Sequence, residues 1–342
     1  MQALQAGLVK GSVASGLDGT YSLTGLAPGS YDVRVATGAY QGQTQRGITV
    51  AIGATAAVNF SLSAILGPTI RITSPSPGSL VDRAVVLVRG EVGSPTAAEL
   101  GVSVNGTPAL VGSGQFAALV AVGPGTQTLT AILSGAGATL GQDAVSVQVV
   151  PDPGAKRILL TASPRSGAAP LTVTLRAAAQ GAVADYQWDA DGDGVVDQSG
   201  AALSQVDVHY LTPGLYVPKV SVKDTQGGSA SEEVAVLVVE QTAVVALLEA
   251  KWRELKDALR GGNVTGALQI VAESRRDRYS AIFQNLTVPP SQVDLILTDL
   301  RFVQFRDNTV EFEMLRTDER GRLSYLVRFA VDVDGIWRLK DF

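Results

Sequence analysis

Short runs in which apolar and polar residues alternate fill the first two thirds of the chain. Clear examples are AVVLVRGEV from residue 84, GTQTLTAILSG from residue 125 and DAVSVQVV from residue 143. A period of two predicts half-buried strands, and the Gly, Pro, Asn and Asp residues between the runs predict turns, among them a hairpin turn at Asn105-Gly106. This part of the chain is therefore expected to be all β.

The pattern changes near residue 241. Apolar residues at spacings of three and four predict an amphipathic helix that ends at Gly261-Gly262, namely Val245, Leu248, Trp252, Leu255 and Leu259. A second helical stretch, residues 265–286, follows it. Alternation then returns in four segments, which are 295–305, 309–315, 323–333 and 337–342. The last hundred residues are therefore expected to form an α+β domain.

Composition supports this division. The 342 residues include 37 glycines and only 17% charged residues, which suits many short strands and tight turns. Residues 241–342 nevertheless hold 15 of the 27 Lys and Arg and 15 of the 32 Asp and Glu. No basic stripe with interleaved aromatic residues precedes them, so nucleic acid is not expected as a partner. No apolar run is long enough to span a bilayer, and Met1 to Gln5 do not resemble a signal peptide.

The first segment resembles the carboxypeptidase regulatory-like domain, a small transthyretin-like sandwich. The residues that carry the resemblance are Asp18-Gly19, Tyr21, Leu23, Leu26, Pro28-Gly29, Tyr31 and Val33. We expect this domain to cover residues 1–63, with a hairpin whose strands are split by Ala27-Pro28-Gly29. That family begins one strand earlier than this chain. We therefore expect a first strand, and with it an export signal, upstream of Met1; alternatively, a neighbouring molecule donates the strand.

Two further β-sandwiches are expected next. Residues 64–152 open with PTIRITSPSPGSLV and resemble a bacterial Ig-like domain, followed by a short linker from Pro151 to Lys156. Residues 153–240 resemble a PKD domain, and the matching residues are Gly167, Pro170-Leu171, Trp188-Asp189, His209-Tyr210, Pro213-Gly214, Tyr216, Val220, Val222, Asp224 and Gly227. Pro218 interrupts the last of these strands, because proline cannot donate to a ladder. We expect an edge or a bulge there.

The C-terminal segment, residues 241–342, resembles the NTF2-like α+β cone. Two helices followed by a four-stranded meander, with the ending DGIWRLKDF, carry the resemblance. The expected fold class is thus mainly β, with tandem Ig-like and transthyretin-like sandwiches followed by an NTF2-like cone. Relatives with that cone include both enzymes and binding modules, so the fold does not decide the activity.

The stretch DYQWDADGDGVVDQSG, residues 185–200, has the spacing of a calcium loop. The side chains of Asp189, Asp191, Asp193 and Asp197 and the carbonyl of Val195 would supply oxygen ligands, and Gly194 would make the sharp turn. Gly200 stands where a bidentate glutamate would complete the set, so Ca²⁺ is expected to bind weakly and to rigidify the loop. The alternative is an ordinary tight turn, since Asp-Gly pairs form turns without metal.

Catalytic chemistry has few candidate residues. The chain has no cysteine and one histidine, His209, which we expect to make a structural hydrogen bond; Trp188 is expected in the core. Ser-His-Asp and zinc chemistry are therefore not expected. In the C-terminal cone, Tyr279, Asp299, Glu311 and Arg328 are candidates for a ligand pocket, although Glu311 also fits a half-solvated strand.

The leading functional hypothesis is a non-catalytic extracellular or cell-surface protein of bacterial type. Its sandwiches would form a stalk that presents the C-terminal module for adhesion, envelope structure, or contact with a cell-surface protein or glycan. One alternative is the accessory tail of a secreted enzyme that degrades polysaccharide or protein. Another is that the C-terminal domain is itself a small enzyme or binds a lipophilic ligand.

Overall fold

The computed structural model describes the chain except for residues 6–7, 17, 36–41, 64–66, 95–98, 136, 153–157, 286–288 and 320, and except for the side chains of Pro290 and Asp318. The chain forms two units, Met1–Gly67 and Pro68–Phe342. The predicted linker from Pro151 to Lys156 falls mostly outside the described residues.

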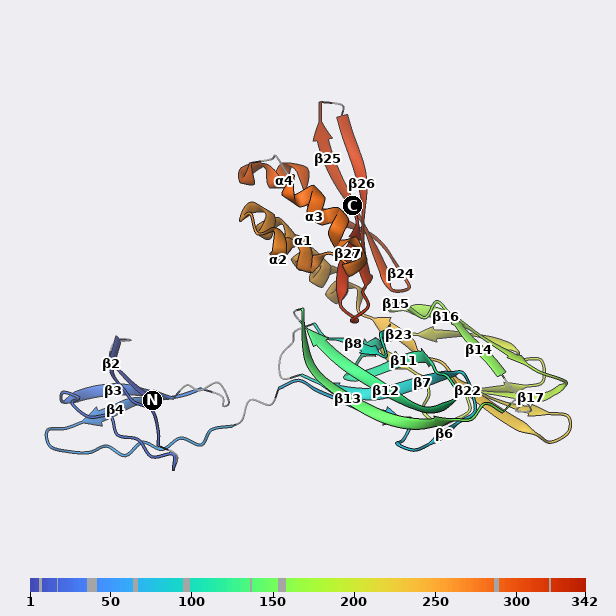
Figure 1. The fold of residues 1–342 in the computed structure, drawn as a ribbon, viewed down its shortest axis with the longest axis horizontal. Coiled ribbons are helices and arrows are strands. Elements are labelled where there is room, and N and C mark those ends of the chain that lie inside the picture. The colour runs from blue at the N-terminus through green and yellow to red at the C-terminus, as the bar shows by residue number, and fades with distance from the viewer. Residues whose placement is uncertain are drawn as a thin grey trace. The chain divides into compact units, whose positions relative to one another are not determined.

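The N-terminal unit contains one four-stranded sheet with the order β2-β1-β3-β4 (Figure 1). Its strands are β1 (Gln2–Gln5), β2 (Leu8–Ser12), β3 (Gly29–Val35) and β4 (Gln43–Val50). Alternate residues of β3, Tyr31, Val33 and Val35, are buried, as their apolar period of two predicts. The same alternation predicted a strand around Tyr21 and Leu23, and this was wrong. Residues 20–24 belong to no strand, because no backbone among the described residues forms a ladder with them.

The first sandwich of the second unit, here residues 68–152, has two sheets, ordered β10-β11-β7-β5 and β6-β13-β12-β8-β9. Its strands are β5 (Thr69–Ser74), β6 (Leu80–Val81), β7 (Val85–Gly93), β8 (Gly101–Val104), β9 (Thr107–Pro108), β10 (Leu110–Gly112), β11 (Gln115–Ala121), β12 (Gly125–Gly135) and β13 (Ala138–Val149). Between the sheets lies a core that includes Val88, Val102, Phe116, Leu129 and Leu133. The predicted turn at Asn105-Gly106 is confirmed, with φ of 48° and 78°.

The second sandwich, here residues 158–240, encloses Trp188, whose side chain is completely buried. Its strands are β14 (Ile158–Ser163), β15 (Ser166–Ala168), β16 (Leu171–Ala179), β17 (Val183–Asp189), β18 (Gln198–Gly200), β19 (Gln205–Tyr210), β20 (Gly214–Tyr216), β21 (Lys219–Asp224), β22 (Ser229–Glu233) and β23 (Val236–Val239). They form the sheets β14-β16-β19, β15-β23-β20 and β18-β17-β21-β22. Pro218 lies between β20 and β21, where the chain passes from one sheet to another. The expected edge or bulge was therefore wrong, because the proline stands between two strands and β21 is an inner strand of its sheet.

The C-terminal module, here residues 241–342, places its helices against one face of a meander ordered β24-β25-β26-β27 (Figure 1). Its elements are α1 (Gln241–Arg260), α2 (Val264–Ile270), the 3₁₀ turn η1 (Glu273–Arg275), α3 (Arg276–Gln284), the 3₁₀ turn η2 (Pro290–Gln292), α4 (Val293–Ile296), β24 (Leu300–Arg306), β25 (Thr309–Asp318), β26 (Gly321–Val331) and β27 (Trp337–Asp341). The second predicted helical stretch is therefore two helices and a turn. No helix among the described residues is both long and apolar enough to cross a lipid bilayer.

The apolar side chains of helix α1 face the sheet. Leu248, Trp252 and Leu255 are almost fully buried there, as the spacing of three and four predicts. Phe312, Phe329 and Leu339 of the sheet complete this core, and each is fully buried. The fold class inferred from the sequence, mainly β with a terminal α+β module, is confirmed.

The second unit consists of three lobes, namely the first sandwich, the second sandwich and the C-terminal module. These lobes are in direct contact. Leu110 and Ala117 of the first sandwich pack against Ala235 of the second. The Ser166 hydroxyl of the second sandwich donates to the Asn308 side chain of the C-terminal module over 2.9 Å. The Glu99 carboxylate of the first sandwich accepts from the Trp337 amide of that module over 2.9 Å. Each lobe therefore touches the other two, and the second unit is not a simple row of domains.

Candidate metal centre

The aspartate-rich loop joins β17 to β18 in the second sandwich. Strand β17 pairs with both β18 and β21, which fixes the start of the loop. Just before the loop, Trp188 is buried and its indole N–H donates to the Leu203 carbonyl over 2.8 Å. A tryptophan on the preceding strand thus anchors the loop to the core.

Asp189, the first aspartate, organises the backbone of the loop. Its side chain is 7% exposed. Its Oδ1 accepts from the amides of Gly192 and Asp193 over 2.7 and 3.1 Å, and its Oδ2 accepts from the amide of Gly194 over 2.9 Å. Gly192 and Gly194 have φ of 80° and 93°, a region that only glycine adopts freely. The Asp-Gly-Asp-Gly pattern therefore forms a tight turn around a buried carboxylate.

The other three aspartates also accept hydrogen bonds from backbone amides of the loop. The Asp193 carboxylate accepts from the Val195 amide over 2.7 Å, and the Asp191 carboxylate accepts from the Asp193 amide over 3.2 Å. Asp197 closes the loop, because its Oδ2 accepts from the Ala190 amide over 2.6 Å while its own amide donates to the Trp188 carbonyl over 2.7 Å. These hydrogen bonds bring Asp197 back to the start of the turn.

Three of these carboxylates converge. One oxygen from each of Asp189, Asp191 and Asp197 lies within 4.8 Å of the other two. Two ligands on opposite sides of one Ca²⁺ ion would be about 4.6–5.2 Å apart, since Ca–O distances are 2.3–2.6 Å. The set consists of hard oxygen donors and so fits Ca²⁺ in both spacing and chemistry. Three like charges this close repel each other, and a cation would relieve that repulsion.

Tyr210, on the adjacent strand β19, lies beneath the loop. Its hydroxyl donates to the Ala190 carbonyl over 2.6 Å. Burial raises the pKa of Tyr210 well above its usual value, and the negative charge of Asp191 raises it further. The phenol therefore stays neutral and acts as a donor that supports the loop. The sequence pattern placed Tyr210 in the sandwich but gave no sign of this contact.

The cluster contains three of the five predicted ligands. Asp193 is not part of it, and its carboxylate instead makes the local turn with Val195. Val195 is 62% exposed. Calcium binding by this loop stays a prediction.

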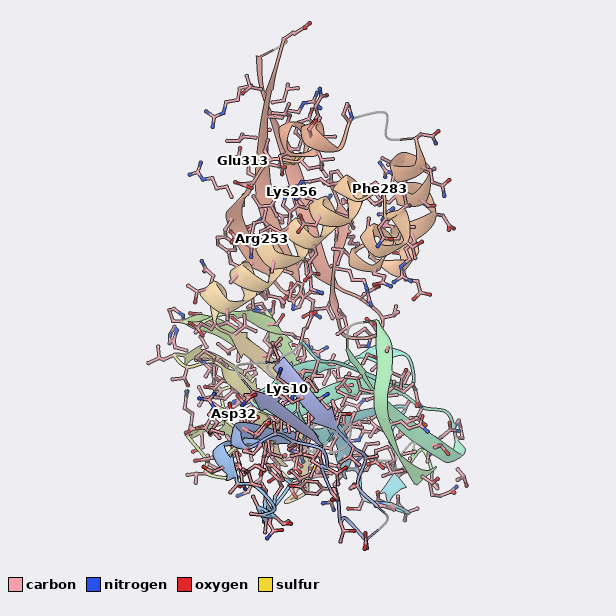
Figure 2. All side chains as sticks on the ribbon, turned by 90° about the vertical axis from the view of Figure 1, so that its left-hand side faces the viewer. Lys10, Asp32, Arg253, Lys256, Phe283 and Glu313 are labelled. Atoms are coloured by element: carbon pink, nitrogen blue, oxygen red, sulfur yellow. The ribbon has the colours of Figure 1, made fainter. Side chains whose placement is uncertain are left out.

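The four candidate pocket residues of the C-terminal module lie in different surroundings. Tyr279 is 2% exposed, and its hydroxyl accepts from the Phe342 amide over 3.0 Å. The Asp299 side chain is 98% exposed and pairs with Lys256, which lies on helix α1 (Figure 2). Glu311 and Arg328 face each other across β25 and β26. The carboxylate of Asp299, predicted as a candidate for a ligand pocket, is thus on the surface.

Aromatic side chains fill the interior of the same module. Phe342 stacks on Tyr279 with ring centroids 5.2 Å apart and meets the edge of Trp252 at 5.5 Å. Phe283, labelled in Figure 2, lies beside Tyr279 at 5.6 Å. Burial raises the pKa of the Tyr279 phenol. Where a ligand pocket was considered, these rings pack on one another.

Lys256 was not singled out from the sequence. Only 6% of its side chain is exposed, and its ammonium contacts Asp294 over 3.1 Å and Asp299 over 3.2 Å. A charged residue within an apolar helical repeat was the available signal, since lysine is rarely buried without partners. Its role is to tie helix α1 to the segment before β24.

Two segments of the chain match family models. Residues 3–63 match the carboxypeptidase regulatory-like domain, and residues 158–238 match the PKD domain. Both agree with the resemblances inferred from the sequence. The aspartate-rich loop lies within the PKD match. No curated protein matches the chain.

Solved structures show limited similarity. Fibronectin(III)-like modules of Clostridium thermocellum CbhA share 16% identity with a TM-score of 0.21, covering 51% of this chain and 96% of theirs. Dimeric latent PorU from Porphyromonas gingivalis shares 15% identity with a TM-score of 0.28, covering 52% of this chain and 20% of its own. An engineered protein shares 29% identity with a TM-score of 0.19, covering 24% of this chain and 20% of its own. This chain therefore spans only a fifth of the latter two.

Proposed function

We propose that this chain is a non-catalytic modular protein of the extracellular or cell-surface type. Its two central sandwiches hold the C-terminal module in a fixed orientation for contact with a protein or a glycan. The PKD and carboxypeptidase regulatory-like matches support this proposal, because both are non-catalytic module types. The order of helices and meander strands supports an NTF2-like cone for the C-terminal module.

The observation that carries the proposal is the position of Glu99. Its Oε2 lies 2.7 Å from the Lys251 ammonium on helix α1, and its Oε1 accepts from the Trp337 amide on β27. Both side chains of the ion pair are mostly shielded, with 16% and 13% exposed. One residue of the first sandwich thus binds both the helical layer and the sheet of the C-terminal module. Such contacts hold the module in one orientation relative to the sandwich. A protein that presents a module to a partner requires this fixed orientation.

The rigidity of this joint can be measured directly. The chain has no cysteine, so Ser146→Cys on β13 and Lys340→Cys on β27 would carry the only two spin labels. Electron–electron resonance should give one narrow distance distribution. Glu99→Gln should broaden it, whereas Arg301→Gln, at a residue whose side chain is 78% exposed, should not. A broad distribution in the unmodified labelled chain would contradict a fixed scaffold.

The contact function has its own test. The purified full chain should bind members of glycan or surface-protein arrays without forming product. Cell fractionation should place it outside the cytosol. Product formation from a glycan or ester substrate that is lost in Asp299→Ala would refute the non-catalytic assignment.

A structural calcium site in the second sandwich is a second, compatible proposal. The convergence of Asp189, Asp191 and Asp197 favours it. When bound, Ca²⁺ would neutralise the cluster and rigidify the turn. The loop then serves stability and not chemistry. The thermal unfolding experiment in the Discussion tests it.

A further inference from the structure

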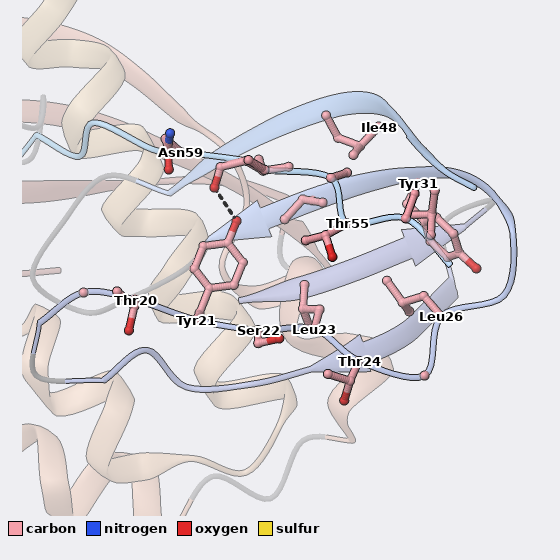
Figure 3. A pocket seen from close by; sticks show the side chains of 18 of the residues that line it. Thr20, Tyr21, Ser22, Leu23, Thr24, Leu26, Tyr31, Ile48, Thr55 and Asn59 are labelled. Carbon is pink, nitrogen blue, oxygen red and sulfur yellow. Dashed lines mark hydrogen bonds between the residues drawn. The ribbon is translucent and has the colours of Figure 1, made fainter. Parts of the chain in front are cut away.

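The groove of the N-terminal unit needs no separate ligand. It lies between residues 18–26 and 54–59, and the Tyr21 hydroxyl donates across it to the Val58 carbonyl over 2.7 Å (Figure 3). The first strand of this domain, which is expected upstream of Met1, would lie there. A different pocket lies in the second unit, where the second sandwich meets the C-terminal module.

This joint pocket has a volume of about 340 Å³ and walls from both lobes. Pro164, Ala168 and Leu171 line it from the second sandwich. Phe302 and Phe305 of β24 line it from the C-terminal module. The pocket therefore exists only while the two lobes are in contact, and one of its walls is aromatic.

The aromatic wall is held in place by other rings of the module. Phe302 meets Phe312 edge-on with ring centroids 6.1 Å apart, and Phe305 meets Trp337 in the same way at 5.9 Å. Phe302 and Phe305 are themselves only half-buried. Rings that are already fixed can bind the C–H face of a ligand at little cost in conformational entropy.

Polar groups at the rim are available for hydrogen bonds. Gln241 and Arg306 line the pocket and are exposed, and within the described part of the chain their side chains make no hydrogen bond or ion pair. The Asp307 carboxylate accepts from the Arg165 amide over 3.3 Å, which fixes its orientation. An amide, a guanidinium and a carboxylate thus stand beside the aromatic wall, and together they offer donors and acceptors to hydroxyl groups.

Charge and width restrict the ligand. Arg306 and Asp307 are the charged residues among those that line the pocket, and their charges cancel. Strands β15 and β24 border it, and their Cα atoms approach within 8 Å (Figure 1). A peptide strand paired with both would need about twice the 4.8 Å spacing of strands, about 9–10 Å. The pocket therefore suits a compact neutral ligand better than an extended peptide.

We propose that this pocket binds a neutral sugar residue of a glycan. The sugar ring stacks its C–H face on Phe302 and Phe305, and its hydroxyls bond the side chains of Gln241, Arg306 and Asp307. The volume is near the lower end of ligand sites, about 300–1,000 Å³, and fits about one or two sugar rings. This inference rests on the proposed contact function, because it names a glycan as the partner and gives it a position.

Calorimetry of the full chain with oligosaccharides tests the class of ligand. The neutral probes are cellotriose, chitotriose, xylotriose, mannotriose and maltotriose. The controls are trigalacturonate, which is acidic, and an acetylated trialanine amide. We expect at least one neutral probe to bind with a dissociation constant of about 0.1–1 mM, at least about tenfold more tightly than the controls. Equal or tighter binding of a control would overturn the assignment, and so would no binding by any neutral probe at about 10 mM.

Variants place the sugar in the pocket. Gln241→Ala and Arg306→Ala should each weaken binding about three- to tenfold by removing one hydrogen bond, without changing the melting temperature. Phe305→Leu should remove most of the binding, because it removes a stacking surface. If Phe305→Leu unfolds the module, the two exposed variants still decide. Arg301→Ala, on the same strand but outside the pocket, is the matched control and should bind like the unchanged chain.

Hydrogen exchange separates this inference from the proposed function. The bound sugar should slow exchange in residues 164–171 and 302–307. Sugar binding that protects other segments, or that both alanine variants leave unchanged, would refute the pocket but keep a glycan as the partner. Binding of a surface protein without binding of any sugar would refute the pocket and keep the contact function. Binding of neither would refute both.

Discussion

The Glu99 carboxylate and the Lys251 ammonium lie 2.7 Å apart, although 152 positions separate them in the chain. Glu99 belongs to the first sandwich and Lys251 to helix α1 of the C-terminal module. The same carboxylate also accepts from the Trp337 amide. Because both partners are largely shielded from water, the contact is screened less than a surface ion pair.

Replacing Glu99 should weaken the second unit measurably. Glu99→Gln keeps the size of the side chain but removes its charge, leaving the Lys251 ammonium partly buried without its charged partner. The free energy of unfolding should fall by about 1–3 kcal/mol. Urea unfolding measured with two spectroscopic probes checks this. Arg301→Gln, which breaks an exposed pair with Glu313, should change stability by less than about 1 kcal/mol. Equal effects of the two variants would contradict the role of Glu99.

Two glycines, Gly101 and Gly335, lie where the backbones of the first sandwich and the C-terminal module approach closely. A Cβ added at Gly101 would lie 2.4 Å from the Asp334 carbonyl oxygen and 2.6 Å from the Gly335 carbonyl carbon. Gly101→Ala should therefore force the lobes apart and cost roughly 1–3 kcal/mol. Gly123→Ala is a matched control, because its only close neighbour is the end of the Gln127 side chain at 3.8 Å. Calorimetry of both variants checks the difference, and a Gly101→Ala variant as stable as the control would show that the lobes do not pack this closely.

Calcium should stabilise the full chain. With a dissociation constant of about 1 mM, 10 mM Ca²⁺ would add about 1.4 kcal/mol. Asp197→Asn and Asp191→Asn should each remove most of this gain, because both belong to the converging cluster. Asp193→Asn should keep more of it. Thermal unfolding with and without Ca²⁺ measures the shift, and Mg²⁺ serves as the ionic control. If no calcium-dependent shift is found, the loop is an ordinary turn.

Acid should destabilise the chain through Asp334. Burial alone would raise its pKa, but hydrogen bonds and charge from Arg338 outweigh burial and lower the pKa below its ordinary value of 3.8. A carboxyl whose folded pKa is depressed stabilises the fold above its unfolded pKa, and this contribution is lost as the pH falls below about 4. Between about pH 4 and pH 2, the free energy of unfolding should therefore fall less steeply for Asp334→Asn than for the unchanged chain. Asp257→Asn, at an exposed carboxylate paired with Arg260, is the control. Identical acid unfolding curves for the chain and Asp334→Asn would contradict this.

Much of the secondary structure followed from local pattern. The period of two predicted β7, β11, β12 and β13, and the spacing of three and four predicted α1 with Leu248 and Trp252 inward. The Asp-Gly pattern predicted the turn after Trp188. These strands, this helix and this turn depend on residues only a few positions apart, so they can be predicted from the sequence alone.

The candidate sites were predicted less completely. The sequence placed five ligands in the calcium loop, but side-chain direction decides which oxygens converge, and Asp193 turns to Val195. Asp299 was predicted as a candidate for a ligand pocket, yet it is exposed and pairs with Lys256. The burial of a side chain depends on which distant segments pack against it in the fold. A local sequence pattern does not contain that information.

The sequence by itself determined most of the strands, turns and helices of this protein, since periodicity and turn chemistry act over a few residues, but it wrongly predicted a strand around Tyr21 and Leu23. Only the tertiary structure decided that the Tyr21 hydroxyl would donate to the Val58 carbonyl, and that Glu99 would pair with Lys251. A strand needs a partner backbone, and an ion pair needs two surfaces in contact. Both come from packing between segments far apart in the chain.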